Sequence, residues 1–138
     1  MATALTRLDS RLEAAFGDTI PALYAAEARA DAATARTLKA HRDLVKAESD
    51  VAFQRVRLLI VADRQQRVDD AHLDAIDEQL ERLEDAADLR DEREGELAQL
   101  LQVREAVAQA MRTRTDAAPD PLTAAARAAV QEVLRRRH

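Results

Sequence analysis

Apolar side chains recur along this chain at helical spacing, beginning close to the N-terminus. The first stretch has a large apolar residue at every third or fourth position: Leu5, Leu8, Leu12 and Phe16. This spacing predicts a short helix over residues 4–16. Gly17 can end it with a left-handed cap, and the chain restarts at Pro21 with Asp18 or Thr19 as N-cap.

The long middle of the chain carries two apolar stripes that do not share one phase. One stripe runs from Leu23 to Val61 and fades from Gln65 onward, whereas the second runs from Leu73 to Met111. The second stripe is offset by one residue, which is about 100° around a helix. A continuous coiled coil does not easily absorb a single extra residue, so the offset favours two helices over one.

The segment "DRQQRVDD" between the two stripes is polar on every face, and Asp69 or Asp70 can cap a new helix. We therefore predict a long helix over residues 20–62, a polar turn over 63–69 and a long helix over 70–112. The two arms then pack antiparallel as a coiled-coil hairpin. The alternative is one straight rod of about 140 Å.

Charge also favours pairing of the two arms. The first arm has seven Lys/Arg and five Asp/Glu, a net charge of +2, and the second has five Lys/Arg and thirteen Asp/Glu, a net charge of −8. A turn centred near residue 66 predicts three ion pairs between the arms: Arg90 with Asp43, Glu94 with Lys39, and Arg104 with Glu27. Gly95 lies inside the second arm and indicates a kink or a close helix contact there.

The remaining C-terminal stretch predicts a linker over residues 113–120 and a last amphipathic helix over residues 121–136. Two glycines and three prolines in 138 residues leave little to interrupt helices. The expected fold class is therefore all-α. It is an antiparallel coiled-coil hairpin of two arms of about 43 residues, flanked by short N- and C-terminal helices, in a single helical domain over residues 1–138.

Composition narrows the classes of function. A net charge of −5 argues against general nucleic-acid binding. The chain has no cysteine, which is compatible with a reducing cytosol. Its longest apolar run, "VRLLIVA", is too short to span a bilayer, and charges interrupt the N-terminus where a signal peptide needs an apolar stretch. We expect a cytoplasmic protein without membrane insertion.

Motifs for catalysis or metal binding are weak. "HRD" at His41 to Asp43 has no glycine-rich loop before it and no "DFG" after it, so a chance match to a kinase loop is favoured. Asp69 and His72 are spaced for metal binding, but the Glu-x-x-His motifs of a four-helix metal centre are absent. We expect no enzyme, no catalytic residue, no cofactor, no metal site and no small-molecule substrate. The alternatives are a four-helix metal-binding protein, or a nucleic-acid or membrane-surface binder acting through the basic residues 135–138.

The first arm carries more apolar surface than one partner helix can cover. The residues beside its alanine stripe that we expect to bind a partner are Leu38, Val45, Ala52, Phe53, Leu59 and Ile60. Another chain covers this surface by self-association or docking, or else the terminal helices cover it. The first option predicts a non-enzymatic helical interaction protein. It would be a self-associating structural or adaptor subunit of a larger protein assembly, of the secretion-machine, phage-particle or chaperone kind, although no motif is specific to any of these.

Overall fold

The computed structural model describes residues 5–63, 67–116 and 121–137, and every regular element within them is a helix. In chain order these are α1 (Asp9–Phe16), α2 (Ile20–Ala25), the 3₁₀ turn η1 (Glu27–Arg29), α3 (Ala32–Val61), α4 (Asp70–Asp116) and α5 (Pro121–Arg136). The chain divides into two compact units, residues 1–104 and 105–138.

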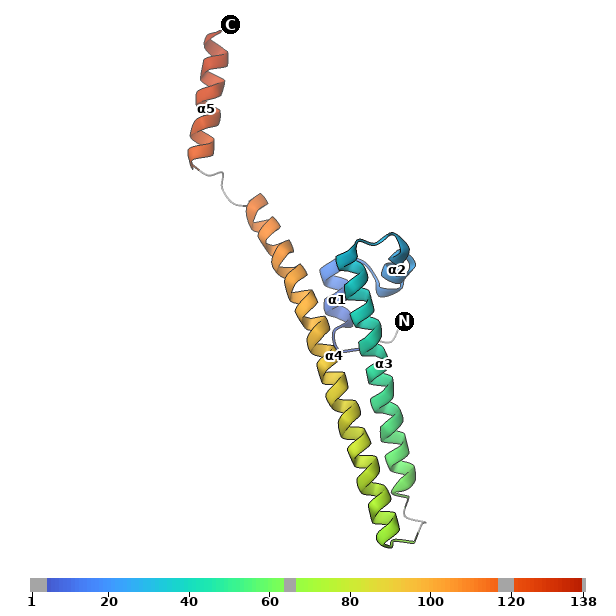
Figure 1. Cartoon of the computed structure of the whole chain (residues 1–138). Coiled ribbons are helices and arrows are strands. Elements are labelled where there is room, and N and C mark those ends of the chain that lie inside the picture. Colours follow the sequence, from blue (N-terminus) through green and yellow to red (C-terminus); the bar gives the residue numbers. More distant parts are fainter. Residues whose placement is uncertain (1–4, 64–66, 117–120, 138) are drawn as a thin grey trace. The chain divides into compact units, whose positions relative to one another are not determined.

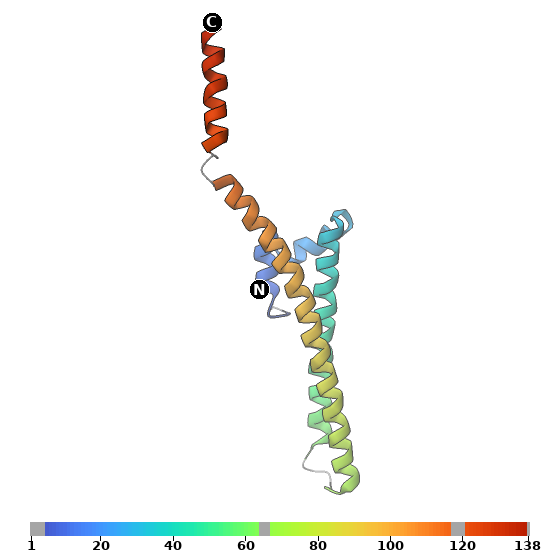
Figure 2. The ribbon, with the colours of Figure 1, turned by 60° about the vertical axis from the view of Figure 1, so that its left-hand side comes forward.

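In the first unit, α3 and α4 lie side by side and antiparallel, as both ribbon views show (Figure 1, Figure 2). The predicted all-α fold, a helical hairpin flanked by short helices, is confirmed. Two contacts across the hairpin set its register near the closed end. His72 Nε2 donates to the Val61 carbonyl at 2.6 Å, and the Gln79 side-chain amide donates to Gln54 Oε1 at 2.7 Å.

The chain leaves the helical conformation between α3 and α4, where the polar turn over 63–69 was expected. Residues 64–66 of that turn lie outside the described residues. Asp69 starts α4, because its Oδ1 accepts a hydrogen bond from the backbone N–H of His72 at 2.8 Å. The predicted N-cap at Asp69 or Asp70 is thus Asp69.

The predicted helix over residues 20–62 is wrong in its first part. The chain leaves the helix after Ala25, forms η1, and starts α3 only at Ala32. Asp31 makes this break stable, because its carboxylate accepts from the backbone N–H of Thr34 at 2.7 Å as an N-cap. The same backbone hydrogen bond, with one from the Thr34 side chain, holds the pKa of Asp31 below its usual value.

Two other predicted boundaries also change. The helix expected over 4–16 begins only at Asp9, because residues 5–8 form a bend and a turn, and the linker expected over 113–120 begins late because α4 continues to Asp116. Thr115 is helical, and its hydroxyl donates to the Met111 carbonyl at 2.9 Å. Residues 117–120 lie outside the described residues, and α5 coincides with the helix predicted over 121–136.

None of the three predicted ion pairs between the arms forms. Their members bond elsewhere: Arg90 to Asp91, Lys39 to Asp43, Glu27 to Arg42, Glu94 to Arg7, and Arg104 to the Ala15 carbonyl. For Glu94 and Arg104 the reason is the N-terminal segment, which packs on the hairpin and supplies Arg7 and Ala15 as partners. Asp43 and Arg90 pair instead with neighbours on their own helices. Glu27 also lies in η1 and not on the long helix, which places it beside Arg42.

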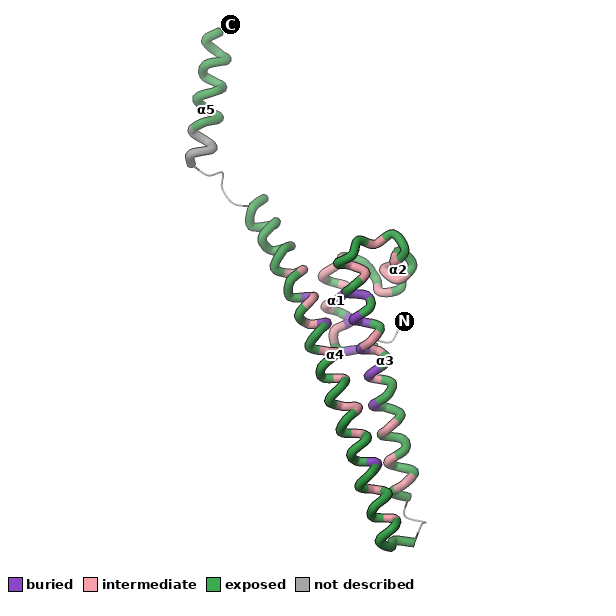
Figure 3. The backbone as a smooth tube through the Cα atoms, viewed as in Figure 1, coloured by how far each residue is buried: buried purple, intermediate pink, exposed green. Residues whose placement is uncertain are grey.

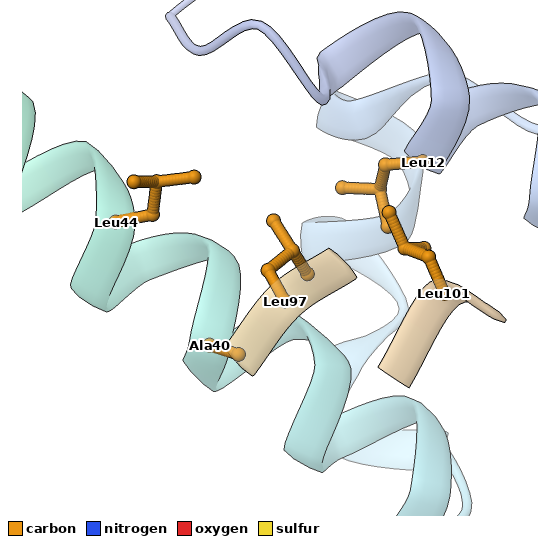
Figure 4. Close-up of a cluster of buried hydrophobic side chains, with 5 residues drawn as sticks. All are labelled: Leu12, Ala40, Leu44, Leu97 and Leu101. Atoms are coloured by element: carbon orange, nitrogen blue, oxygen red, sulfur yellow. The ribbon is translucent and has the colours of Figure 1, made fainter. Parts of the chain in front are cut away.

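The apolar core lies where α1 packs against the hairpin. Figure 4 shows its members: Leu12 from α1, Ala40 and Leu44 from α3, and Leu97 and Leu101 from α4. All four leucines are fully buried. The closed end of the hairpin is coloured mostly as exposed or intermediate in Figure 3, so burial is concentrated at the α1 end of the first unit.

The two glycines provide a matched pair of tests. Gly17 has φ of +68° as the C-cap of α1, whereas Gly95 lies inside α4, and a Cβ at either position meets no atom within 4 Å. The close helix contact expected at Gly95 is therefore wrong. We expect Gly17→Ala to destabilise the fold by about 1 kcal/mol through backbone strain, and Gly95→Ala to stabilise it by about 0.5–1 kcal/mol. Urea unfolding followed by circular dichroism measures both, and equal signs would contradict the assignment.

Candidate interaction surface and a buried histidine network

A chain of buried polar side chains connects the first three segments of the fold. His41 of α3 is 1% exposed, and its Nε2 donates to Asp9 Oδ1 of α1 at 2.9 Å. Its Nδ1 lies 2.7 Å from the hydroxyl of Tyr24 in α2, which also donates to the Leu38 carbonyl at 3.1 Å. The hydroxyl of Thr6 donates to Asp9 Oδ1 at 2.6 Å. The network thus ties α1, α2 and α3 together.

The charge of Asp9 is stabilised inside this network. Burial alone favours the neutral acid, but hydrogen bonds from Thr6, from His41 and from the backbone N–H of Leu5 outweigh that effect and lower the pKa of Asp9. Burial raises the pKa of Tyr24, which keeps its hydroxyl protonated and able to donate at neutral pH. Asp9 is therefore a buried carboxylate with its acceptor positions occupied.

Acid, histidine and hydroxyl in series also occur in catalytic relays, but here the group at the end of the series is already engaged. The Tyr24 hydroxyl is bonded to a backbone carbonyl, and His41 and Asp9 are enclosed by the fold. We interpret the network as a structural clamp for the N-terminal segment. Sequence reasoning missed it by treating "HRD" as a chance match. The available signal was the helical spacing of His41 from the buried residues Thr37 and Leu44.

The six residues predicted to bind a partner do not form one surface. Leu38 is fully buried by the chain itself, so it does not belong to an exposed face. Val45 is half-buried, and the remaining four, Ala52, Phe53, Leu59 and Ile60, are exposed. Of the three large side chains among them, Leu59 is the most exposed, at 68%. The exposed residues all lie in the half of α3 nearest the closed end of the hairpin.

Helix geometry divides these four exposed residues between two sides of α3. Ala52 directly follows the inward-facing Val51, and Leu59 directly follows the inward-facing Leu58. Successive side chains are rotated by about 100° around the helix axis, so Ala52 and Leu59 point to the same side of α3. Phe53 and Ile60 instead each precede an inward-facing residue, Gln54 and Val61, and are rotated by about 100° in the opposite sense. On that second side, the guanidinium of Arg57 lies 5.8 Å from the Phe53 ring centre.

Helix α4 adds two exposed leucines to the side that carries Ala52 and Leu59. Leu73 lies three residues before the inward-facing Ile76, and Leu80 lies four residues after it. Both side chains are therefore rotated from Ile76 by about 40–60° around α4, in the same sense in which Ala52 and Leu59 are rotated around α3. In two antiparallel helices, side chains that are rotated from the contact in the same sense along each chain point to the same side of the pair. We name Ala52, Leu59, Leu73 and Leu80 the tip face.

Charged residues border the tip face on both of its helices. Arg55 lies beside it on α3, and Asp77 and Glu84 lie beside it on α4. Within the described part of the chain, none of these three forms an ion pair. Over the whole of α3 there are six Lys/Arg and three Asp/Glu, whereas residues 70–104 of α4 have four Lys/Arg and twelve Asp/Glu. Glu48, three residues before Val51, also lies on this side of α3, so the tip face is bordered by charges of both signs on α3 and by acidic residues on α4.

In the second unit, both helical segments expose apolar side chains. Val107 and Met111 are exposed on the end of α4, and Val130, Val133 and Leu134 are exposed on α5. Arg135 and Arg136 at the end of α5 both lie within ion-pair distance of Glu132, at 3.7 and 3.3 Å. The basic C-terminus is therefore partly neutralised by its own helix.

Asp69 and His72, the residues with metal-ligand spacing, each bond to a backbone group, Asp69 through Oδ1 and His72 through Nε2, whereas His72 Nδ1 is buried and has no hydrogen-bond partner among the described residues. Among the described residues there is no group of three potential metal ligands, and none of their helices is long and apolar enough to cross a membrane. Comparisons with protein-family models, with curated proteins and with solved structures each found no match to the chain.

Proposed function

We propose that this chain is a non-enzymatic helical interaction protein, a self-associating structural or adaptor subunit of a larger protein assembly. The observation that carries the proposal is the tip face, where large apolar side chains stay exposed on two packed helices. Burying one leucine side chain fully stabilises a contact by about 1.5–3 kcal/mol. The tip face carries three exposed leucines, Leu59, Leu73 and Leu80, and their burial by a partner chain favours association.

The enclosed histidine network and the core both lie at the α1 end of the first unit, which supports different roles for the two ends of the hairpin. The α1 end holds the fold together, and the closed end of the hairpin presents its apolar side chains to a partner. A rigid helical scaffold with an exposed apolar face is a common way to present a docking surface. This arrangement suits a subunit that recognises helices of other chains.

We expect the purified protein to be a dimer or larger species at micromolar concentration, as measured by sedimentation over a range of concentrations. Leu59→Glu with Leu80→Glu is expected to raise the dissociation constant at least about tenfold, because two charges would enter an apolar contact. Both positions are exposed in the single chain, so the fold itself tolerates the change.

The matched control is Gln99→Glu with Gln102→Glu. It adds the same two charges at exposed positions away from the tip face, and it is expected to leave the mass in solution unchanged. A wild-type chain that stays monomeric at high concentration contradicts self-association. Equal weakening by the control pair contradicts the assignment of the contact to the tip face.

A further inference from the structure

We propose that the tip face binds helix α5 of a second copy of this chain. The inference rests on the proposed self-association and adds which part of the second copy makes the contact. It follows from the way in which the N-terminal segment already covers the same side of the hairpin, and from the apolar side chains and the charge of α5.

One row of residues along α3 is covered at one end of the hairpin and bare at the other. Its members are spaced by seven residues, which is close to two full turns, so they share one side of the helix: Leu38, Val45, Ala52 and Leu59. Leu38 is fully buried, Val45 is half-buried, and Leu59 is 68% exposed. Burial along this row therefore falls toward the closed end.

Helix α4 carries a matching row with the same spacing: Leu73, Leu80, Ala87, Glu94 and Leu101. The N-terminal segment covers its far end, because Leu12 of α1 packs with the buried Leu101 (Figure 4) and Arg7 forms an ion pair with Glu94 at 2.8 Å. Leu73 and Leu80 at the closed end are exposed. This side of the hairpin thus already accepts one helix, α1, and the tip face is the uncovered continuation of that contact.

Helix α5 has the apolar side chains that a second contact of this kind needs. Val130, Val133 and Leu134 lie on one side of α5 and are 59%, 56% and 54% exposed. On the same side, Ala126 lies seven residues before Val133, the spacing of the rows on α3 and α4. One helix of this length can therefore place apolar side chains at both levels of the tip face.

Charge favours α5 over a second hairpin as the occupant. The residues that border the tip face are Glu48, Arg55, Asp77 and Glu84, with a net charge of −2. Residues 121–137 contain four arginines and one glutamate, a net charge of +3. A second hairpin would bring its own acidic α4 and its N-terminal segment to this border, whereas α5 brings one basic helix. Opposite charges across a contact favour encounter and suppress wrong partners.

The α5 that binds comes from another copy, because α5 of the same chain is too short to reach back to the tip face. Helix α4 rises about 54 Å between Leu80 and Asp116. The chain from Asp116 to Val133, even if fully extended as far as Pro121 and helical after it, spans at most about 36 Å. The contact joins two different surfaces, so it continues from copy to copy as a chain or closes as a ring.

Complementation between two full-length variants tests this contact. The tip variant is Leu59→Lys with Leu80→Lys, and the α5 variant is Val130→Glu with Val133→Glu. All four side chains are exposed in the single chain, so we expect circular dichroism to show unchanged helix content. Each variant alone should have a dissociation constant raised at least about tenfold, because two charges enter an apolar contact beside charges of the same sign.

A mixture of the two variants at equal amounts should regain association, as measured by sedimentation. The tip variant keeps an intact α5, and the α5 variant keeps an intact tip face. We therefore expect a dimer that contains one chain of each variant and no larger species, whereas the wild type forms larger species as its concentration rises.

The matched control is Ala128→Glu with Gln131→Glu, which adds the same two charges to α5 on the side away from Val130 and Val133. It is expected to weaken association less than the α5 variant does. Equal weakening would show that the net charge of α5, and not its apolar side, determines the contact, which overturns the proposal.

The remaining outcomes overturn the proposal at different points. Association of the α5 variant alone shows that tip faces bind one another, and association of the tip variant alone shows that α5 binds elsewhere. Two monomeric variants that stay monomeric when mixed exclude the contact between α5 and the tip face. A wild-type chain that is monomeric at high concentration removes the proposed self-association itself, so the two failures are distinguishable.

Discussion

Replacing Leu97 with alanine should lower the free energy of unfolding by about 2–5 kcal/mol. Leu97 is fully buried where α1, α3 and α4 meet, with Leu12 and Leu44 among its neighbours in the core. These neighbours come from helices far apart in the sequence, each held by its own backbone hydrogen bonds. They cannot close fully around a missing side chain, so the variant loses apolar contact and retains part of a cavity.

Urea unfolding at one fixed protein concentration measures this loss, because self-association would add its own concentration-dependent stability. The control is Val103→Ala in the same helix, where the side chain is 63% exposed. It is expected to change the free energy of unfolding by about 0.5 kcal/mol or less. Equal losses in the two variants would show that the cluster around Leu97 is not the core.

The hairpin was predictable because the apolar phase along a helix reports which side is buried. The one-residue offset between the stripes before Val61 and after Leu73 favoured two helices over one, and the contact of His72 with Val61 lies at that change of phase. Pairing of the arms depends on this periodicity and on a polar turn, and both are local properties of the sequence. Local sequence patterns were therefore sufficient to predict the helical hairpin.

The break before α3 was not predictable in the same way. Residues 26–31 contain neither glycine nor proline, and alanine there favours helix. Asp31 can lie inside a helix or cap one, and which of the two occurs depends on the tertiary contacts that each conformation allows. Here the break lets Tyr24 in α2 reach His41 in α3. This gain is tertiary and is absent from any local pattern.

The candidate interaction surface also depends on tertiary contacts that local sequence patterns do not reveal. Periodicity identified the apolar side of α3, but it could not assign which residues the chain covers itself. Leu38 is covered in the part of α3 close to the N-terminal segments, whereas Leu59 is left exposed near the closed end. The distinction depends on where α1 docks, and α1 docks through Leu12 and the buried Asp9. The predicted ion pairs failed for this reason as well, because Arg7 takes Glu94.

The two ends of the hairpin consequently differ in what stabilises them. The α1 end has the apolar core and the polar clamp, whereas the seam at the closed end contains the amide pair of Gln54 and Gln79. An amide pair in the seam contributes less apolar burial than two leucines would. A partner on the tip face therefore adds apolar contact where the isolated hairpin has least of it.

Replacing Asp9 with alanine is expected to lower the free energy of unfolding by about 3–5 kcal/mol at pH 7. The carboxylate of Asp9 is the acceptor for the His41 ring, the Thr6 hydroxyl and the Leu5 backbone N–H, at 2.9, 2.6 and 2.6 Å. The variant leaves the two buried donors, His41 and Thr6, without this acceptor, and each unsatisfied buried donor is destabilising by about 1–3 kcal/mol. Tyr24→Phe is the milder comparison, because it removes one hydroxyl and leaves the ring in place.

The pH dependence of the free energy of unfolding distinguishes the contribution of the charge of Asp9 from that of its hydrogen-bonding shape. Because the pKa of Asp9 is lower in the folded chain than its ordinary value of 3.8, ionised Asp9 stabilises the fold above that value, and this contribution is lost as the pH falls through the folded pKa. The stability difference between wild type and Asp9→Asn should therefore be constant from pH 7 down to about pH 5 and shrink below about pH 4. Urea unfolding of both proteins between pH 3 and pH 7 measures it. A difference that stays constant down to pH 3 would show that the hydrogen-bonding shape of Asp9, and not its charge, supports the clamp.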